Sequence, residues 1–270
     1  MNKAIFITGV SLGNGGYAIA ERFAREGWDI FITSRKLERA QQAAEQLVKD
    51  YGIYAKGYQL WFRDEQAVKN VFEDIDQQGR FIETVCLYAA DLGAGKDPAE
   101  GMKIFETDIE DFQKVIDTNV VWNFMIVRQA ALRMRKEHRG AIVFIGSNSA
   151  LRPNPNRVAY IASKGGINSM SRALAVDLGQ YGIRSNVIMP GTIKTQRWVA
   201  MGNRQISNGA MVPLGDISDF EDIANAVWFL GTKASKNISG TELVIDGGMS
   251  TQIYPQLLNE LKKEKMNNMF

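Results

Sequence analysis

Short apolar runs and amphipathic stretches alternate along the chain. The continuously apolar runs predict buried strands and are KAIFITG, DIFITSR, YAKGYQLW, ETVCLYAA, GAIVFIG, RSNVIMPG and TELVIDGG. Apolar positions at helical spacing predict helices between them, near residues 17–27, 37–51, 65–78, 108–137, 160–180 and 219–231. Strands that alternate with helices favour right-handed βαβ units. The pattern therefore predicts an α/β fold, a doubly wound, seven-stranded parallel sheet with helices on both faces.

Length and charge narrow the possible functions. The chain has 270 residues and a formal net charge of +2, so no strong field favours a nucleic-acid partner. No repeat or proline-rich linker interrupts the pattern, and residues 1–270 are expected to form a single domain. Cys86 lies in an apolar run and His138 at a helix end, and each is the only residue of its type, so we expect neither a disulfide nor a metal site. Without an apolar stretch of membrane-spanning length or a signal peptide, we expect a soluble cytoplasmic protein with no membrane partner.

The first predicted strand ends in a glycine-rich turn, ITGVSLGNGGYAIAERF. Gly9, Gly13, Gly15 and Gly16 lie between a strand and a helix, which is the context that a phosphate-binding turn requires. Glycine lets the backbone approach a pyrophosphate, and the helix N-terminus supplies N–H groups. The turn predicts a dinucleotide site in a Rossmann-type domain; a merely structural turn is the alternative.

The end of the second predicted strand indicates which dinucleotide binds. An acidic residue there would accept hydrogen bonds from the ribose 2′-hydroxyl, whereas arginine pairs with a 2′-phosphate. This strand ends at Ser34 and Arg35, with no acid. We therefore predict NADP(H) in preference to NAD(H), with Ser34, Ser11 and Lys36 assisting Arg35. The alternative is that both cations simply cap the strand in water.

Further polar residues follow the fifth predicted strand. Ser147 closes the run AIVFIG, at the edge where open parallel sheets bind ligands. Tyr160 and Lys164 are four residues apart in a predicted helix, so both side chains leave one face of it. A nearby ammonium lowers the pKa of a phenol, which suits it to general acid–base catalysis. Alone, the Tyr–Lys pair fits a solvated helix face better; with the glycine turn, it predicts nucleotide-dependent chemistry.

Together these motifs resemble the classical short-chain dehydrogenase/reductase family, from about residue 3 to residue 249. The family's glycine turn TGxxxGxG begins in this chain at Thr8, its catalytic serine is matched by Ser147, and its YxxxK motif by Tyr160 and Lys164. Asn119 falls where the family has a catalytic asparagine that holds a proton-relay water. The resemblance also implies cofactor contacts at Ala89, Pro190, Ile193 and Thr195.

The resemblance implies an NAD(P)-dependent oxidoreductase that moves a hydride between nicotinamide C4 and a carbonyl or carbinol carbon. Ser147 would polarise the substrate oxygen, and Tyr160 would give or take its proton. Lys164 would lower the Tyr160 pKa and hold the nicotinamide ribose, and Asn119 would order a water leading to solvent. The family is commonly dimeric or tetrameric. We expect a homotetramer, or a homodimer, with the Tyr160 helix and the 108–137 helix at its main interface.

Three stretches depart from the family pattern. The glycine turn is one residue longer, so either Gly15 or Gly16 stands for the third family glycine. LYAA at 87–90 replaces the family's NNAG. WFRD at 61–64 replaces DVTD, so Trp61 stands in place of the acid that contacts adenine. Phe62 or Arg63 could line the base pocket, although core packing explains an aromatic there equally well.

The substrate pocket is expected between the loop after Ser147 and a lid at about 193–215. Its polar residues favour a small-molecule substrate with hydroxy or keto groups, such as a sugar, polyol or hydroxy acid. The alternatives are a steroid or bile acid, an acyl chain tethered to a carrier protein, and a non-catalytic NADP(H)-sensing regulator. The polar residues are Ser149, Arg152, Asn154, Asn156, Arg157, Gln196, Arg197, Asn203 and Arg204; the apolar ones are Trp198, Met201, Met211 and Val212.

A C-terminal extension, at about 250–270, continues past the usual family end. Leu257, Leu258 and Leu261 form an apolar stripe at helical spacing, with lysines around it. We expect a helix that packs on this subunit or on a neighbouring one.

Overall fold

The centre of the molecule is a parallel sheet. The computed structural model describes residues 3–61, 64–93, 101–200, 211–254, 260 and 263. Seven strands pair in the order β3-β2-β1-β4-β5-β6-β7, and every pairing is parallel, which confirms the predicted fold class. The strands are β1 (Lys3–Ile7), β2 (Asp29–Ser34), β3 (Ala55–Gln59), β4 (Phe81–Leu87), β5 (Gly140–Ile145), β6 (Ile183–Pro190) and β7 (Glu242–Ile245).

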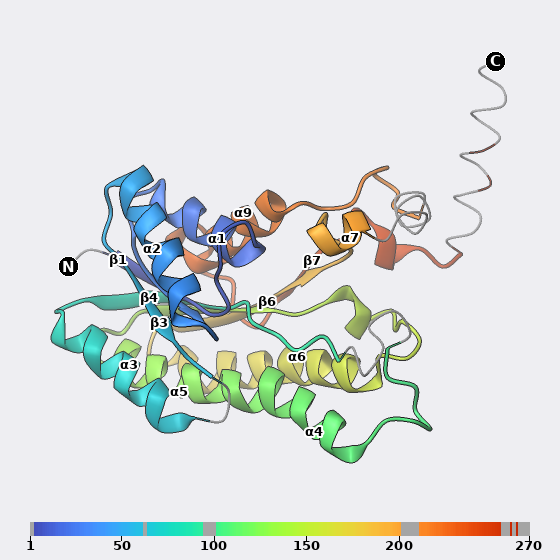
Figure 1. Ribbon diagram of the computed structural model, residues 1–270, viewed down its shortest axis with the longest axis horizontal. Helices are drawn as coiled ribbons and strands as arrows, with labels where there is room; N and C mark the ends of the chain where they lie inside the picture. The colour runs from blue at the N-terminus through green and yellow to red at the C-terminus, as the bar shows by residue number, and fades with distance from the viewer. Residues whose placement is uncertain are drawn as a thin grey trace.

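Helices form a layer on each face of this sheet. In Figure 1, α1, α2 and α9 lie over one face, and α3, α5 and α6 over the other. The helices are α1 (Gly15–Ala24), α2 (Leu37–Tyr51), α3 (Glu65–Gln77), α4 (Ile109–Ile116), α5 (Trp122–Met134), α6 (Val158–Gly179), α7 (Gln196–Ala200) and α9 (Phe220–Gly231). Within the described part of the chain, none of them combines the length and apolar character that crossing a bilayer requires. The predicted stripe of Leu257, Leu258 and Leu261 lies outside the described residues.

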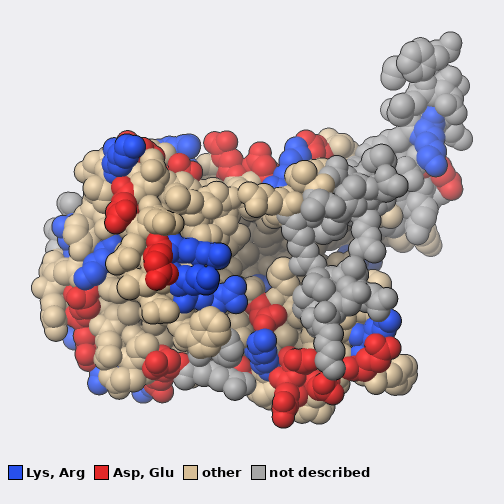
Figure 2. Space-filling view, viewed as in Figure 1, with Lys and Arg blue, Asp and Glu red and all other residues tan. Residues whose placement is uncertain are grey.

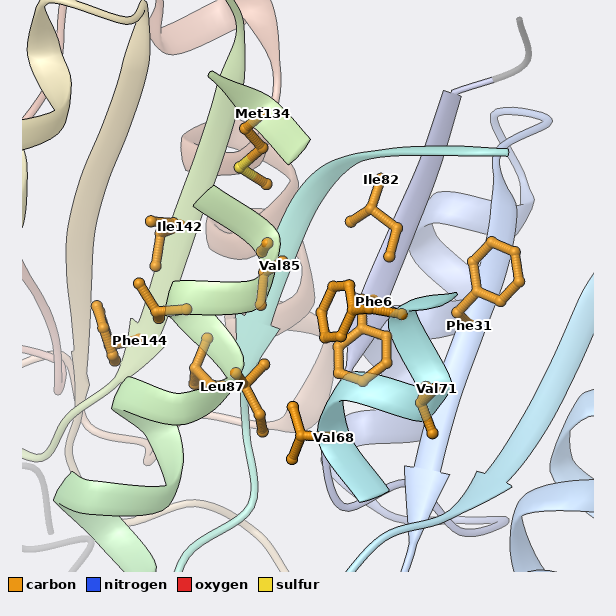
Figure 3. Packing of buried hydrophobic residues seen from close by; sticks show 14 of the residues in the cluster. Phe6, Phe31, Val68, Val71, Ile82, Val85, Leu87, Met134, Ile142 and Phe144 are labelled. Atoms are coloured by element: carbon orange, nitrogen blue, oxygen red, sulfur yellow. The ribbon is translucent and has the colours of Figure 1, made fainter. Parts of the chain in front are cut away.

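Side chains of the central strands alternate between two cores. In β1, Ile5 and Ile7 pack toward α1 and α9, whereas Phe6 packs toward α3 and α5. Figure 3 shows Phe6 and Val85 directed toward these two helices. The Phe6 ring lies 5.0 Å from that of Phe72, centroid to centroid. Burial of each such side chain stabilises the fold by about 1.5–3 kcal/mol, so the strand ends that carry the site are held on both faces.

The helix predicted over 108–137 is interrupted. The chain is helical from Ile109 to Met134, but a wider π-helical turn, η1 (Asp117–Val121), separates α4 from α5. The prediction of one regular helix is therefore wrong at this point. Such turns widen the backbone spiral by one residue and occur frequently at functional sites. Asn119 lies at the centre of this one and is buried.

The lone cysteine and histidine lie where the sequence placed them. Cys86 is a free thiol in β4 with no exposed surface, and burial raises its pKa. His138 is exposed and follows α5 with a φ of 48°, the left-handed conformation common just past a helix end.

Candidate functional site

The glycine turn joins β1 to α1. Gly9 and Gly13 have φ angles of 75° and 74°, which side chains rarely adopt. A Cβ on Gly9 would lie 2.8 Å from the Cβ of Ala89, so Gly9 lets the end of β4 come close. A Cβ on Gly13 would meet nothing within 4 Å. Gly13 is therefore the turn glycine that faces open space.

Asn14 closes this longer turn from within. Its Oδ1 accepts a hydrogen bond from the Tyr17 amide at 2.9 Å, which caps α1, and its Nδ2 donates to the Gly9 carbonyl at 2.9 Å. The next two glycines, Gly15 and Gly16, form the first turn of α1. A Cβ on Gly15 would lie 2.7 Å from the Tyr88 hydroxyl, and one on Gly16 3.1 Å from the Tyr88 ring. Both glycines therefore make room for Tyr88, which replaces the second family asparagine.

A cavity of about 600 Å³ opens at the carboxyl ends of β1, β2 and β4, which we call the nucleotide cavity. Figure 2 shows a hollow in this face with Lys and Arg side chains at its rim. The glycine turn forms one side and the segment after β4 another, as expected for a dinucleotide site. The cavity is lined by Gly9, Val10, Ser11, Asn14, Thr33, Ser34, Arg35, Arg39, Leu60, Trp61, Tyr88, Ala89, Ala90, Asp91, Leu92, Lys114, Thr118 and Trp122.

Two arginines contribute positive charge to this cavity. The Arg35 guanidinium lies 5.7 Å from the Trp61 ring centre, within cation–π range, and the Arg35 carbonyl accepts from Gln59. Arg39, which our sequence analysis missed, joins it from the first turn of α2. Its place in the first turn of the helix that follows Arg35 was a signal that could have revealed it. Lys36 is the N-cap residue of α2 and does not line the cavity, although it was predicted to assist. The predicted base-pocket residues Phe62 and Arg63 lie outside the described residues.

Ser147, Tyr160 and Lys164 converge beyond the carboxyl end of β5. The Ser147 side chain interacts with the Tyr160 hydroxyl and lowers its pKa. The Lys164 Nζ lies 5.5 Å from the Tyr160 ring centre and donates to the Ile145 carbonyl at 2.6 Å. Because the two helix residues are one turn apart, both side chains face the sheet edge. The structure thus brings together the three residues that the sequence grouped.

Burial is the largest cause of the pKa shifts of Lys164 and Tyr160. Lys164 is 2% exposed, and burial lowers its pKa to about 8. Burial also raises the pKa of Tyr160, while the Ser147 hydrogen bond and the positive charge of Arg157 lower it. The Tyr160 pKa therefore lies above its ordinary value, not below it as we expected, and Lys164 is not among the resolved causes of the shift. A low-dielectric site penalises both charged forms, and for the phenol this penalty exceeds the attraction from nearby cations.

The Asn119 side chain makes hydrogen bonds to other residues of the protein. Its Oδ1 accepts from the Asp91 amide at 2.7 Å, and its Nδ2 donates to the Asp91 carbonyl at 2.8 Å and the Ser163 hydroxyl at 2.9 Å. Both amide hydrogens are thereby used. The side chain ties the segment after β4 to α6, so a relay water would find only the second Oδ1 lone pair or the main-chain carbonyl.

The segment after β6 carries the other predicted nicotinamide contacts. Pro190 ends β6, and Ile193 pairs with Ser218 in an isolated parallel bridge. The Thr195 hydroxyl accepts from the Trp198 amide at 3.0 Å, so it caps the start of α7. Met201, Asn203 and Arg204, which we predicted for the lid, lie outside the described residues, as does the Arg197 side chain.

The loop after Ser147 is more self-contained than its composition suggested. Ser149 is buried and accepts from the Asn154 side chain at 3.2 Å. The Arg152 Nε donates to the Ser250 carbonyl at 3.1 Å, and Arg157 donates to main-chain carbonyls after β4. Much of this polar set therefore bonds to the protein itself, which weakens the argument for a polar substrate.

Comparisons with known proteins agree with this geometry. The sequence profile of a family described as Enoyl-(Acyl carrier protein) reductase matches residues 11–250. The bovine (Bos taurus) 3-oxoacyl-(acyl-carrier-protein) reductase is 33% identical over 250 residues, which are 92% of this chain and 98% of that protein.

Solved structures share the fold over nearly the whole chain. ElxO with NADP bound superposes with a TM-score of 0.84 at 27% identity, covering 93% of this chain and 100% of the other. A xylitol dehydrogenase with bound NAD+ superposes with a TM-score of 0.81 at 26% identity, covering 91% and 98%. Structural relatives thus include both NADP-bound and NAD-bound proteins.

Proposed function

Because the chain belongs to the short-chain dehydrogenase/reductase family and is an NAD(P)-dependent oxidoreductase, we propose that it transfers hydride between NADP(H) and a carbonyl or secondary alcohol. The observation that carries this proposal is the convergence of Ser147, Tyr160 and Lys164 at the sheet edge, next to the nucleotide cavity. The nicotinamide, when bound, supplies or accepts the hydride. The protein's own contribution is placement and proton transfer.

Ser147 and Tyr160 have distinct tasks at the substrate oxygen. The Ser147 hydroxyl, fixed by the Ser149 amide at 3.1 Å, orients that oxygen. The Tyr160 hydroxyl gives the oxygen a proton during reduction and takes it during oxidation. Lys164, protonated below a pKa of about 8, stabilises the phenolate that forms when Tyr160 has given up its proton.

Replacement of the phenol tests this assignment. Tyr160→Phe should lower kcat by about 100-fold or more, the contribution of a positioned acid or base, while the Kd for NADPH, followed by its fluorescence, changes little. Phe229→Tyr, which adds a hydroxyl to α9 far from the site, is the control. Turnover of Tyr160→Phe near that of the unsubstituted enzyme would contradict the proposal.

The preference for NADP(H) is supported by Arg35 and Arg39 at the end of β2. Two guanidinium groups in one cavity wall favour a 2′-phosphate, and the described part of that wall has no acid at the end of β2 that would favour a 2′-hydroxyl. We expect kcat/KM to be larger with NADPH than with NADH. Equal values would contradict this preference.

Two of the expected substrate classes have support from relatives. A small sugar, polyol or hydroxy acid is the preferred class, in keeping with the likeness to xylitol dehydrogenase. A 3-oxoacyl chain on a carrier protein is favoured by the likeness to the bovine reductase. Acetoacetyl-pantetheine and xylitol, each assayed with both cofactors by absorbance at the NADPH band, separate the two. Turnover of the thioester alone would reject the polyol class.

We also propose a cytoplasmic homotetramer built on the outer face of α4 and α5. Ile109 and Phe124 are 82% and 48% exposed there, an unusual arrangement for large apolar side chains. A free thiol such as Cys86 persists in a reducing compartment. Light scattering on Ile109→Glu, which places a charge on this face, should show dissociation; an unchanged assembly would reject the interface.

A further inference from the structure

Arg157 joins two parts of the chain at the edge of the site. It is the N-cap residue of α6, three residues before Tyr160. Its Nη1 donates to the carbonyls of Leu92 and Gly93, at 3.3 Å each. These carbonyls belong to the segment that follows β4. One guanidinium therefore holds that segment against the start of α6.

The segment held in this way touches Tyr160. Gly93 has a φ of 56°, and a Cβ built on it would lie 3.4 Å from the Tyr160 Cβ and 3.6 Å from the Tyr160 amide nitrogen. On the other side of Arg157, the Met102 amide donates to the Asn156 carbonyl at 2.8 Å. The backbone around Tyr160 is thus packed between segments that meet at Arg157.

Charged groups reach Tyr160 from several elements. Lys164 lies on the same helix and directs its Nζ at the Ile145 carbonyl. Asp91, after β4, accepts from the Gly93 amide at 2.9 Å, and Asp246, after β7, accepts from Ser250 and Asn148. Of these charges, only that of Arg157 is among the resolved causes of the Tyr160 shift, and it lowers the pKa of the phenol against the effect of burial.

We propose that Arg157 is a positioning residue of the catalytic centre, which fixes the backbone of Leu92 and Gly93 against Tyr160 and supplies positive charge beside the phenol. This inference rests on the proposed function of Tyr160. It changes the role expected from the sequence, where Arg157 was placed among the groups that face the substrate. One guanidinium nitrogen, Nη1, bonds the two carbonyls, and the charge of the group stabilises the phenolate.

Removal of the Arg157 charge should shift the pH dependence of kcat/KM in one direction. In alcohol oxidation Tyr160 must be deprotonated, so kcat/KM rises with pH through its pKa. Arg157→Gln removes a cation that favours the phenolate, so the rising limb moves to higher pH. At each pH on that limb, kcat/KM falls by about two- to fivefold, the effect of a partly screened charge.

Three variants separate charge from geometry. Arg157→Gln loses both, whereas Arg157→Lys keeps the charge but replaces the planar guanidinium by a compact ammonium on a differently shaped side chain. We expect the pH limb of Arg157→Lys to match that of the unsubstituted enzyme, while both variants raise the KM of the substrate. Lys69→Gln, which removes an exposed lysine paired with Glu73 on α3, is the control for net charge. The Kd for NADPH is followed in each variant, because Arg157 does not itself line the nucleotide cavity but Leu92, which it holds, does.

The outcomes distinguish this inference from the proposed function. An Arg157→Gln limb at its original pH, or an Arg157→Lys limb displaced as far as that of Arg157→Gln, overturns the inference while Tyr160→Phe remains inactive. An active Tyr160→Phe overturns both. A displaced limb in Arg157→Gln that Arg157→Lys restores supports the inference.

Discussion

Lys164 makes the protein less stable at neutral pH, and its replacement by methionine should show this. The side chain is 2% exposed, and its pKa is lowered from 10.5 to about 8. One pKa unit corresponds to about 1.4 kcal/mol. Keeping this ammonium charged at pH 7 therefore costs the folded state about 3 kcal/mol. The hydrogen bond to the Ile145 carbonyl returns about 1 kcal/mol of that cost.

The sign of the pH dependence follows from proton counts. Between the folded pKa of about 8 and the unfolded value of 10.5, the unfolded state binds more protons, so stability rises with pH. About 2 kcal/mol of the penalty should disappear between pH 7 and pH 9.5. Tyr160 acts in the opposite direction, because its folded pKa is raised, but only where unfolded tyrosine ionises, near pH 10.

Urea unfolding measures the effect. Buried Trp28 and Trp122 provide a fluorescence signal, and the protein concentration is held fixed because assembly adds to stability. Lys164→Met should be more stable than the unsubstituted protein by about 2 kcal/mol at pH 7, and this advantage should vanish near pH 9.5. Turnover should be lost at every pH. A stability difference that stays constant from pH 7 to pH 9.5 would show that Lys164 is not penalised by burial.

Three further predictions concern the two ends of the site. Arg35→Ala should raise the KM for NADPH by about tenfold or more, since a charge-assisted contact is worth about 1.5–3 kcal/mol, with little change for NADH; parallel changes for both cofactors would reject a phosphate contact. Gly9→Ala should lower the free energy of unfolding by about 2 kcal/mol or more, because its Cβ meets that of Ala89, whereas Gly13→Ala should cost only about 1 kcal/mol of backbone strain. Equal losses in thermal unfolding would contradict the close approach at Gly9. Asn119→Ala should lower the free energy of unfolding by about 2–3 kcal/mol, because it leaves Asp91 and Ser163 without these hydrogen bonds. An undiminished melting temperature would show that the bonds do not hold the segment after β4.

The parallel sheet and the grouping of Ser147, Tyr160 and Lys164 could be predicted from the sequence, because both follow from local patterns. Strand and helix periods are local, and a spacing of four on one helix fixes a shared face, so Tyr160 and Lys164 could be paired without a structure. Arg39 lies in the first turn of the predicted helix that follows Arg35, and this position could have revealed it as a second cation at the end of β2.

Other features depend on contacts that no local pattern contains. The pKa of Tyr160 depends on how deeply the sheet edge and α6 bury it, and spacing says nothing about burial. The π-helical turn at Asn119 depends on bonds to Asp91 and Ser163, which are 28 and 44 residues away. Arg157 was expected to line the substrate pocket because it is polar and lies in the loop after Ser147. Its carbonyl partners lie in a segment that the apolar pattern left undefined.

The buried thiol of Cys86 makes this chain a convenient background for site-directed labelling. With its only cysteine sealed inside the central strand, the folded protein offers maleimide reagents almost nothing to attack. A single cysteine introduced at an exposed position, for instance that of Leu214, would then be the one site that takes up a fluorophore or spin probe. The surroundings of this position could then be followed during turnover without first removing a native side chain.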